Sequence, residues 1–244
     1  MTDVIPLFNQ GSPDGFCETP TAATIINAAR YCLVNQRMGL VVGEPGIGKT
    51  TALRHFTQST MGVHFVTINP TLRTLHAALS HIAQEIGCYP GGRARETYEI
   101  LERGLGRRHG RLVILDEAQH LSDEALEALR CIHDETRAGV LLCGNAYFRT
   151  RFNNERRGFG QITSRLGIRI VLEHPDAADV DSICAQREVH DPAARSFLVT
   201  QSRTVGALRL VDSLIEMAAK LAGSAGAIRV KHLKDGLRML GGEA

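Results

Sequence analysis

The sequence predicts an α/β fold: five parallel strands form a sheet flanked by helices, and a small all-helical domain follows. Three observations support this. Short apolar segments alternate with helical patterns as far as residue 172, as in parallel βαβ units. A glycine-rich loop separates the first strand from the next helix, and after Pro175 only helical patterns remain. We therefore expect a flexible arm at 1–18, an α/β domain at 19–174 and a helical lid at 175–244.

The first part of the chain shows clear element boundaries. Residues 1–18 have no regular period, and Thr19 and Pro20 then suit the N-cap and first position of a helix. The apolar run 39–42 predicts the first strand. A helix over 49–59 and a strand over 63–69 follow, the latter because its side chains alternate and are β-branched.

The remaining elements follow from the same periodicities. Helical patterns cover 72–86 and 96–108, and Ser122 is suited to cap a further helix. A buried strand is expected at 112–115, and further strands at 140–143 and 168–172. In the lid we expect helices over 176–188, 192–201, 205–222 and 231–240.

Composition excludes some classes of protein. The 244 residues contain no apolar run of 18 or more, so no transmembrane helix is expected, and residues 1–10 do not resemble a signal peptide. The expected location is the cytoplasm. The net charge is only +2, but all except four of the 28 basic residues are arginines, which suits bidentate phosphate contacts. A GC-rich genome would produce the same bias.

The six cysteines do not suggest a metal site. None forms a C-x-x-C pair, and most have apolar neighbours in the sequence. We expect them to be reduced core residues.

The segment 43–50 matches the G-x-x-x-x-G-K-[ST] motif in full. Such a loop directs backbone N–H groups and a helix N-terminus at phosphate oxygens. Lys49 would reach the β- and γ-phosphates, and Thr50 would place its hydroxyl on Mg²⁺. The motif predicts binding of ATP with Mg²⁺ by Gly43, Glu44, Pro45, Gly46, Ile47, Gly48, Lys49, Thr50 and Thr51.

Two acids follow the apolar strand 112–115. Asp116 would hold Mg²⁺ directly or through water, and Glu117 would act as general base on the attacking water. An acid next to the metal ligand predicts ATP hydrolysis to ADP and phosphate rather than binding alone. Asn145, at the end of a later strand, could orient that water, although an asparagine there could equally cap a turn.

Two arginines are candidates for contact with the γ-phosphate. Arg165 precedes the fifth strand, where it could reach a nucleotide held by a neighbouring subunit. It could instead be a surface or DNA-contacting residue. Arg209, one turn into a lid helix, could contact the phosphate of its own subunit or lie on a solvated face. Rivals to Arg165 are Arg149, Arg151, Arg156, Arg157 and Arg169.

Taken together, these motifs resemble those of AAA+ ATPases, in the family's order, over residues 19–240. Within that group the chain resembles the transposition regulators of the Mu B and TnsC type. This resemblance rests on four features: the Thr-Pro-Thr helix before the P-loop, Leu115–Leu121, the Cys143-Gly144-Asn145 strand end and the short lid. The Mu B protein has an additional N-terminal helix-turn-helix domain. Only 18 residues precede the core here, so an accessory role in site recognition is not expected.

The resemblance implies a function. Such proteins assemble as ATP-dependent rings or helical filaments on duplex DNA, recruit a DDE-type transposase to target DNA, and leave when ATP is hydrolysed. The residues suggest DNA contacts at two loops, expected to protrude from one rim: Thr71, Arg73 and Thr74, then Arg93 and Arg95. Ordinary solvated loops remain an alternative for each. Other possible functions are a helicase-loader-like or ExeA-like ATPase that acts on a protein, or a nucleotide kinase. No membrane partner is expected.

Overall fold

The computed structural model describes residues 15–106, 110–153, 160–223 and 226–242, which form two compact units. One unit contains Thr24–Gly43 and Leu53–Leu172, and the other contains Met1–Ala23, Glu44–Ala52 and Glu173–Ala244. Most of the expected arm, residues 1–14, lies outside the described residues. The expected domain limits at residues 18 and 174 remain a prediction.

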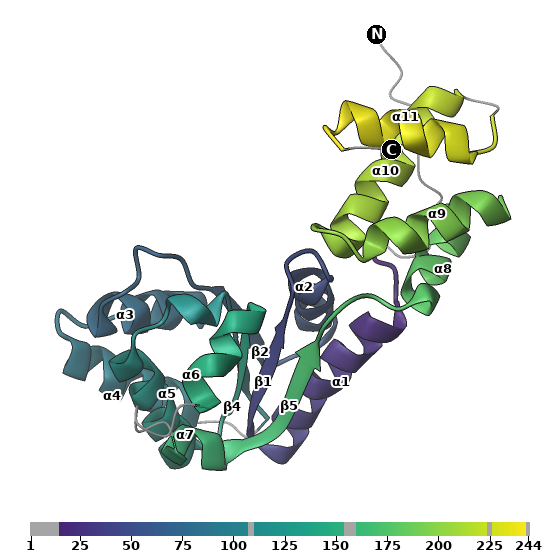
Figure 1. Cartoon of the computed structure of the whole chain (residues 1–244). Coiled ribbons are helices and arrows are strands. Elements are labelled where there is room, and N and C mark those ends of the chain that lie inside the picture. Colours follow the sequence, from purple (N-terminus) through teal and green to yellow (C-terminus); the bar gives the residue numbers. More distant parts are fainter. Residues whose placement is uncertain (1–14, 107–109, 154–159, 224–225, 243–244) are drawn as a thin grey trace, which may run out of the picture. The chain divides into compact units, whose positions relative to one another are not determined.

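The first unit is built on a parallel sheet, which confirms the predicted fold class (Figure 1). Its strand order is β2-β3-β4-β1-β5. Each strand lies within two residues of its predicted limits. The strands are β1 (Met38–Gly43), β2 (Val63–Thr67), β3 (Leu112–Asp116), β4 (Gly139–Gly144) and β5 (Leu166–Leu172).

Helices pack on both faces of this sheet. Met38, Leu40 and Val42 of β1 share a core with α3 (Leu75–Glu85), α4 (Ala94–Gly106) and α5 (Asp123–Thr136). α1 (Pro20–Asn35) lies on the opposite face, where an added Cβ at Gly39 would come within 2.4 Å of Cys32 Sγ. Figure 1 shows α3, α4 and α5 on one side of the strands and α1 on the other.

Helix starts follow the capping chemistry that the sequence indicated. The Thr19 hydroxyl accepts the Ala22 N–H at 3.1 Å, and the Ser122 hydroxyl accepts the Ala125 N–H at 3.2 Å. α2 (Lys49–Ser59) has the predicted limits. Four short segments were not predicted, because three to six residues are too few to show a helical period: η1 (Ala118–His120), η2 (Ala146–Phe148), α6 (Arg149–Asn153) and α7 (Gly160–Arg165).

The other unit contains the four predicted lid helices. They are α8 (Ala177–Gln186), α9 (Pro192–Ser202), α10 (Ala207–Ala222) and α11 (Val230–Met239). Val180, Leu198 and Leu214 belong to their common apolar core. None of the helices in the described ranges is both long enough and apolar enough to cross a membrane.

The six cysteines are all free thiols. Cys32, Cys143 and Cys184 are buried, as expected, whereas Cys17, Cys88 and Cys131 are only partly buried. Burial raises the pKa of Cys32 to about 12 and that of Cys184 to about 11. Both thiols are therefore protonated and unreactive at neutral pH.

Candidate functional site

The glycine-rich loop directly follows β1 and ends on the first turn of α2. Gly46 and Gly48 have φ angles of +88° and +95°, which side chains rarely adopt. Lys49 Nζ donates a hydrogen bond to the Glu44 carbonyl at 2.9 Å. An added Cβ at Gly48 would meet no described atom within 4 Å, so backbone is open to close approach there. The loop geometry fits a bound phosphate chain.

The first turn of α10 contacts this loop within the same unit. The Gly46 carbonyl accepts the Arg209 N–H at 3.2 Å, and a Cβ added at Gly46 would lie 2.1 Å from the Gly206 carbonyl oxygen. The Arg209 side chain is exposed. The backbone at Arg209 therefore lies beside the loop, while its side-chain contact with a nucleotide remains a prediction.

The two predicted acids differ in their surroundings. Asp116, the last residue of β3, is buried at 2% exposure, and one of its carboxylate oxygens accepts the Glu117 N–H at 3.1 Å. Glu117 leaves the strand in the left-handed conformation, with φ 55° and ψ 34°, and is exposed. The turn gives one sheltered carboxylate beside one accessible to water, as a metal ligand and a general base require.

Asn145 begins η2 at the end of the neighbouring strand β4. Its side-chain oxygen accepts the Phe148 N–H at 2.9 Å, so it caps a turn, as the alternative interpretation held. Its backbone N–H donates to Gln119 Oε1 at 3.3 Å. A role in orienting water remains a prediction.

Gln119 is a site residue that the sequence analysis did not identify. Its side-chain amide donates through Nε2 to Glu117 Oε2 and accepts the Asn145 N–H through Oε1. Two signals could have indicated it: its place two residues after Glu117, and its position within Leu115–Leu121, one of the segments on which the resemblance rests.

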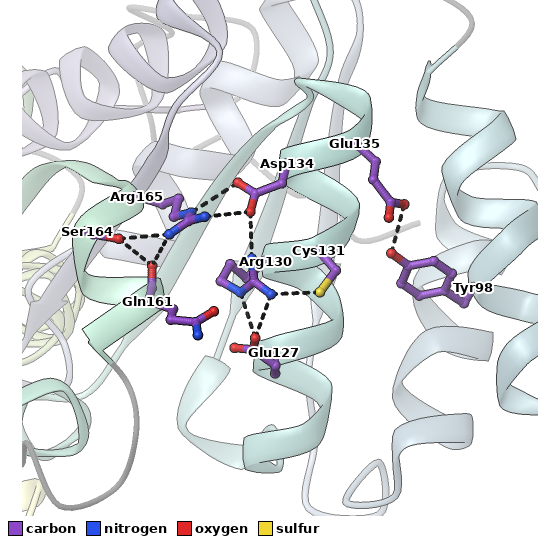
Figure 2. A network of polar contacts seen from close by, with 9 residues as sticks. All are labelled: Tyr98, Glu127, Arg130, Cys131, Asp134, Glu135, Gln161, Ser164 and Arg165. Atoms are coloured by element: carbon purple, nitrogen blue, oxygen red, sulfur yellow. Dashed lines mark hydrogen bonds and ion pairs between the residues drawn. The ribbon is translucent and has the colours of Figure 1, made fainter.

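Arg165 forms an ion pair with Asp134 of its own chain (Figure 2). Its Nε and Nη2 atoms donate to the two carboxylate oxygens at 3.1 and 2.9 Å. Asp134 also pairs with Arg130 at 2.6 Å, and the hydrogen bond from Arg165 is the main cause of a lowered Asp134 pKa. Arg165 would have to leave Asp134 to reach another subunit.

The rival arginines also differ in their contacts. Arg151 donates to the Leu121 carbonyl at 2.8 Å and pairs with Asp123. Arg169 donates to the Thr163 carbonyl at 2.8 Å, and Arg149 is exposed. Arg156 and Arg157 lie outside the described residues. Of the described rivals, Arg151 is thus committed to its own unit, whereas Arg149 and Arg169 are both exposed.

That the proposed DNA-contacting residues protrude from one rim remains a prediction. Thr71, Arg73 and Thr74 precede α3, whereas Arg93 directly precedes α4 and Arg95 lies in its first turn rather than in the predicted loop. Thr74 caps α3 by accepting the Ala77 N–H at 3.2 Å, and Arg95 pairs with Glu99 at 3.1 Å. All five residues are exposed, but two already serve the helices.

Family models match both parts of the chain. A model described as an AAA domain matches residues 33–152, and one described as the Mu B transposition protein, C terminal, matches residues 164–240. The chain is 31% identical over 232 residues to the ATP-dependent target DNA activator B of Escherichia phage Mu, covering 93% of this chain and 74% of that protein. It is 29% identical over 201 residues to the Mu-like prophage FluMu DNA transposition protein B of Haemophilus influenzae, covering 80% and 70%.

Solved structures agree on the fold. The Aeropyrum pernix ORC1 protein in complex with DNA has a TM-score of 0.65 at 21% identity, covering 93% of this chain and 68% of that one. The Thermotoga maritima RuvB Holliday junction branch migration motor has a TM-score of 0.57 at 16% identity, covering 96% and 73%. At these identities the likeness establishes an AAA+ fold and no more.

Proposed function

The chain belongs to the family of the Mu B transposition protein, and we propose that it assembles on duplex DNA in its ATP-bound form and regulates transposition there. At the level of the family it is an AAA+ ATPase of DNA transposition. One observation carries the proposal: a complete P-loop, with Gly46 and Gly48 in the required backbone conformations, in a chain 31% identical to an ATP-dependent target DNA activator.

In this proposal the phosphates of ATP are held by the loop N–H groups and by Lys49. The Lys49 ammonium now donates to the Glu44 carbonyl and would exchange that neutral acceptor for charged phosphate oxygens. Thr50 and Asp116 would hold Mg²⁺, an assignment that rests on the two motifs. The ion would neutralise charge that develops on the phosphate oxygens.

In the proposed hydrolysis of ATP, Glu117 acts as the general base. Its carboxylate takes a proton from water while the water oxygen bonds to the γ-phosphorus and the bond to ADP breaks. Asn145 would orient the water, and Arg165 of a neighbouring subunit and Arg209 of the same chain would stabilise the transferred phosphoryl group. Loss of that group would release the assembly from DNA.

The proposed partners are duplex DNA, further copies of this chain as a ring or helical filament, and a DDE-type transposase. Thr71, Arg73, Thr74, Arg93 and Arg95 are the candidate contacts with the DNA backbone. Exposed arginines and hydroxyls bind phosphates without reading the sequence. Binding should therefore weaken steeply with salt, as release of counterions requires.

Electron microscopy of the purified chain with duplex DNA and a slowly hydrolysed ATP analogue tests the proposal. We expect DNA-bound oligomers with the analogue and none with ADP. Lys49→Ala should lose nucleotide binding and assembly together. Glu117→Gln should still bind ATP and DNA, but because it does not hydrolyse ATP it should stay assembled on the DNA. Absence of any DNA-bound oligomer would reject the proposal, whereas normal turnover by Glu117→Gln would reject the assignment of the base.

The DNA contacts are tested by a double substitution, Arg93→Ala with Arg95→Ala. We expect the affinity for duplex DNA to fall whatever the DNA sequence. The slope of the logarithm of the binding constant against the logarithm of salt concentration should decrease in magnitude by about two, one for each lost phosphate contact. Arg30→Ala is the matched control, because Arg30 is an exposed arginine on α1 outside both loops. Equal affinity and salt dependence in the double variant and the control would remove this loop from the DNA surface.

A further inference from the structure

Gln119 connects the proposed base to the end of the neighbouring strand. Through Nε2 it donates to Glu117 Oε2, and through Oε1 it accepts the Asn145 N–H at 3.3 Å. Glu117 immediately follows β3 and Asn145 immediately follows β4, which are paired neighbours in the sheet. One side chain thus links the two strand ends at which the predicted hydrolytic residues stand.

A primary amide is suited to this position for a chemical reason. A carboxylate can only accept hydrogen bonds and a backbone N–H can only donate one, so the connecting group must donate at one end and accept at the other. Glutamine does both. Glutamate would keep the acceptor for Asn145 but would place a second negative charge beside Glu117, and leucine would offer neither bond.

The surroundings of Gln119 hold it in place. A Cβ added at Gly144 would lie 2.8 Å from Gln119 Oε1, so the amide lies directly against the β4 backbone. Arg151 donates to the Gln119 carbonyl at 3.4 Å and to the Leu121 carbonyl at 2.8 Å. The Arg151 side chain is only 15% exposed and also pairs with Asp123, so it fastens η1 and the residues after it to α6.

We propose that Gln119 is a positioning residue that orients the Glu117 carboxylate toward the attacking water and couples that orientation to Asn145. This inference rests on the proposed role of Glu117 as general base. Glu117 is exposed and its side chain has several rotatable bonds, so a fixed partner reduces the rotamers it samples. Proton transfer requires the base within about 3 Å of the water, and misplacement lowers the rate without weakening nucleotide binding.

The test compares steady-state ATP hydrolysis by the full chain, with duplex DNA present, for the parent protein, Gln119→Leu and Gln119→Glu. We expect kcat to fall about tenfold or more in both variants, as part of the 10² to 10⁴ that general-base catalysis supplies in full. KM and the Kd of a fluorescent ATP analogue should stay within about twofold of the parent values. Gln84→Leu, an exposed glutamine on α3, is the control for a glutamine-to-leucine change.

A double variant separates this role from a purely structural one. If Gln119 acts through Glu117, Glu117→Gln with Gln119→Leu should be no slower than Glu117→Gln alone. Should Gln119→Leu fail to fold, as thermal melting would reveal, Gln119→Glu still decides, because it keeps the bond to Asn145.

The experiments distinguish failure of the proposed function of Glu117 from failure of the proposed role of Gln119. Normal turnover by Glu117→Gln rejects the proposed base and with it this inference. If Glu117→Gln is inactive but Gln119→Glu is fully active, the positioning role of Gln119 is rejected while the role of Glu117 as base stands. Additive losses of rate in the double variant, or a weaker Kd for the ATP analogue in the single variants, would also reject positioning through Glu117.

Discussion

The ion pair between Arg165 and Asp134 makes the assignment of an intersubunit arginine testable by two opposite substitutions. Arg165→Ala removes the arginine, and Asp134→Ala leaves it without its carboxylate partner. If Arg165 serves a neighbouring active site, the two changes should have different effects on turnover. If it only fastens α7 to α5, the two changes should have the same effect on turnover.

The structure sets the scale of the stability effect. Arg165 and Asp134 have side chains that are 34% and 31% exposed, so solvent screens their attraction and the pair contributes about 1 kcal/mol. Asp134→Ala also removes a partner from Arg130, which keeps Glu127 at 2.6 Å. We expect losses of about 1 kcal/mol for Arg165→Ala and about 1–2 kcal/mol for Asp134→Ala, small beside the 5–15 kcal/mol of a typical domain.

The catalytic scale is larger. An arginine that stabilises phosphoryl transfer contributes about 10³ or more in rate, or about 4 kcal/mol of barrier. Arg165→Ala should therefore bind ATP normally, melt a few degrees lower and lose about 10³ in kcat. Asp134→Ala should melt lower still yet keep kcat within about threefold. Phosphate release with duplex DNA, together with thermal melting, measures both quantities.

Mixing subunits provides the control. Glu117→Gln subunits should be inactive but carry an intact Arg165, so their co-assembly with Arg165→Ala subunits should restore part of the turnover. If Arg165→Ala hydrolyses ATP at the wild-type rate, Arg165 is not the intersubunit arginine, and Arg149 becomes the next candidate to test. Equal losses of kcat in Arg165→Ala and Asp134→Ala, or no recovery in co-assembled mixtures, would assign the pair a structural role.

Three further predictions follow from particular contacts. Gly46→Ala should abolish binding of a fluorescent ATP analogue, because it demands a positive φ and a Cβ 2.1 Å from the Gly206 carbonyl oxygen. Ser122→Ala should lower the free energy of unfolding by about 1 kcal/mol in urea titrations, because the cap on α5 is lost. His133 is buried, and burial lowers its pKa from 6.5, so protonation favours the unfolded chain. Stability should fall as pH falls below 6.5, and less so in His133→Gln; an unchanged pH dependence would contradict this.

The sheet could be predicted from the sequence because each strand is a short run rich in apolar or β-branched residues. β1 and β4 are buried along their whole length, whereas β2 contains His64 and β5 contains Arg169. β3 is buried along its whole length and ends at Asp116. The P-loop was equally readable, because its glycines and lysine are required by backbone geometry. Patterns of this kind are local, because the residues that define each strand or the loop lie close together in the sequence.

The contacts of Arg165 and the loops around α3 could not be predicted in the same way. Asp134 precedes Arg165 by 31 residues, and no period connects an acid on one helix to an arginine on another. The placement of Arg95 in a loop was wrong because α4 begins at Ala94, two residues before its predicted start. Two rival arginines, Arg156 and Arg157, lie outside the described residues.

Glu117 shows why motif reading stops one step short of a mechanism. The motif places an acid after Asp116 but does not specify the left-handed conformation that moves Glu117 out of the strand and into solvent. A base released in this way gains access to water and loses the restraint that the sheet would have given it. The restraint must then come from a side chain beyond the strand, and Gln119 is the residue in contact with it. Residues that follow a catalytic strand end should therefore be examined for groups that donate to the base, even where the motif places no demand on them.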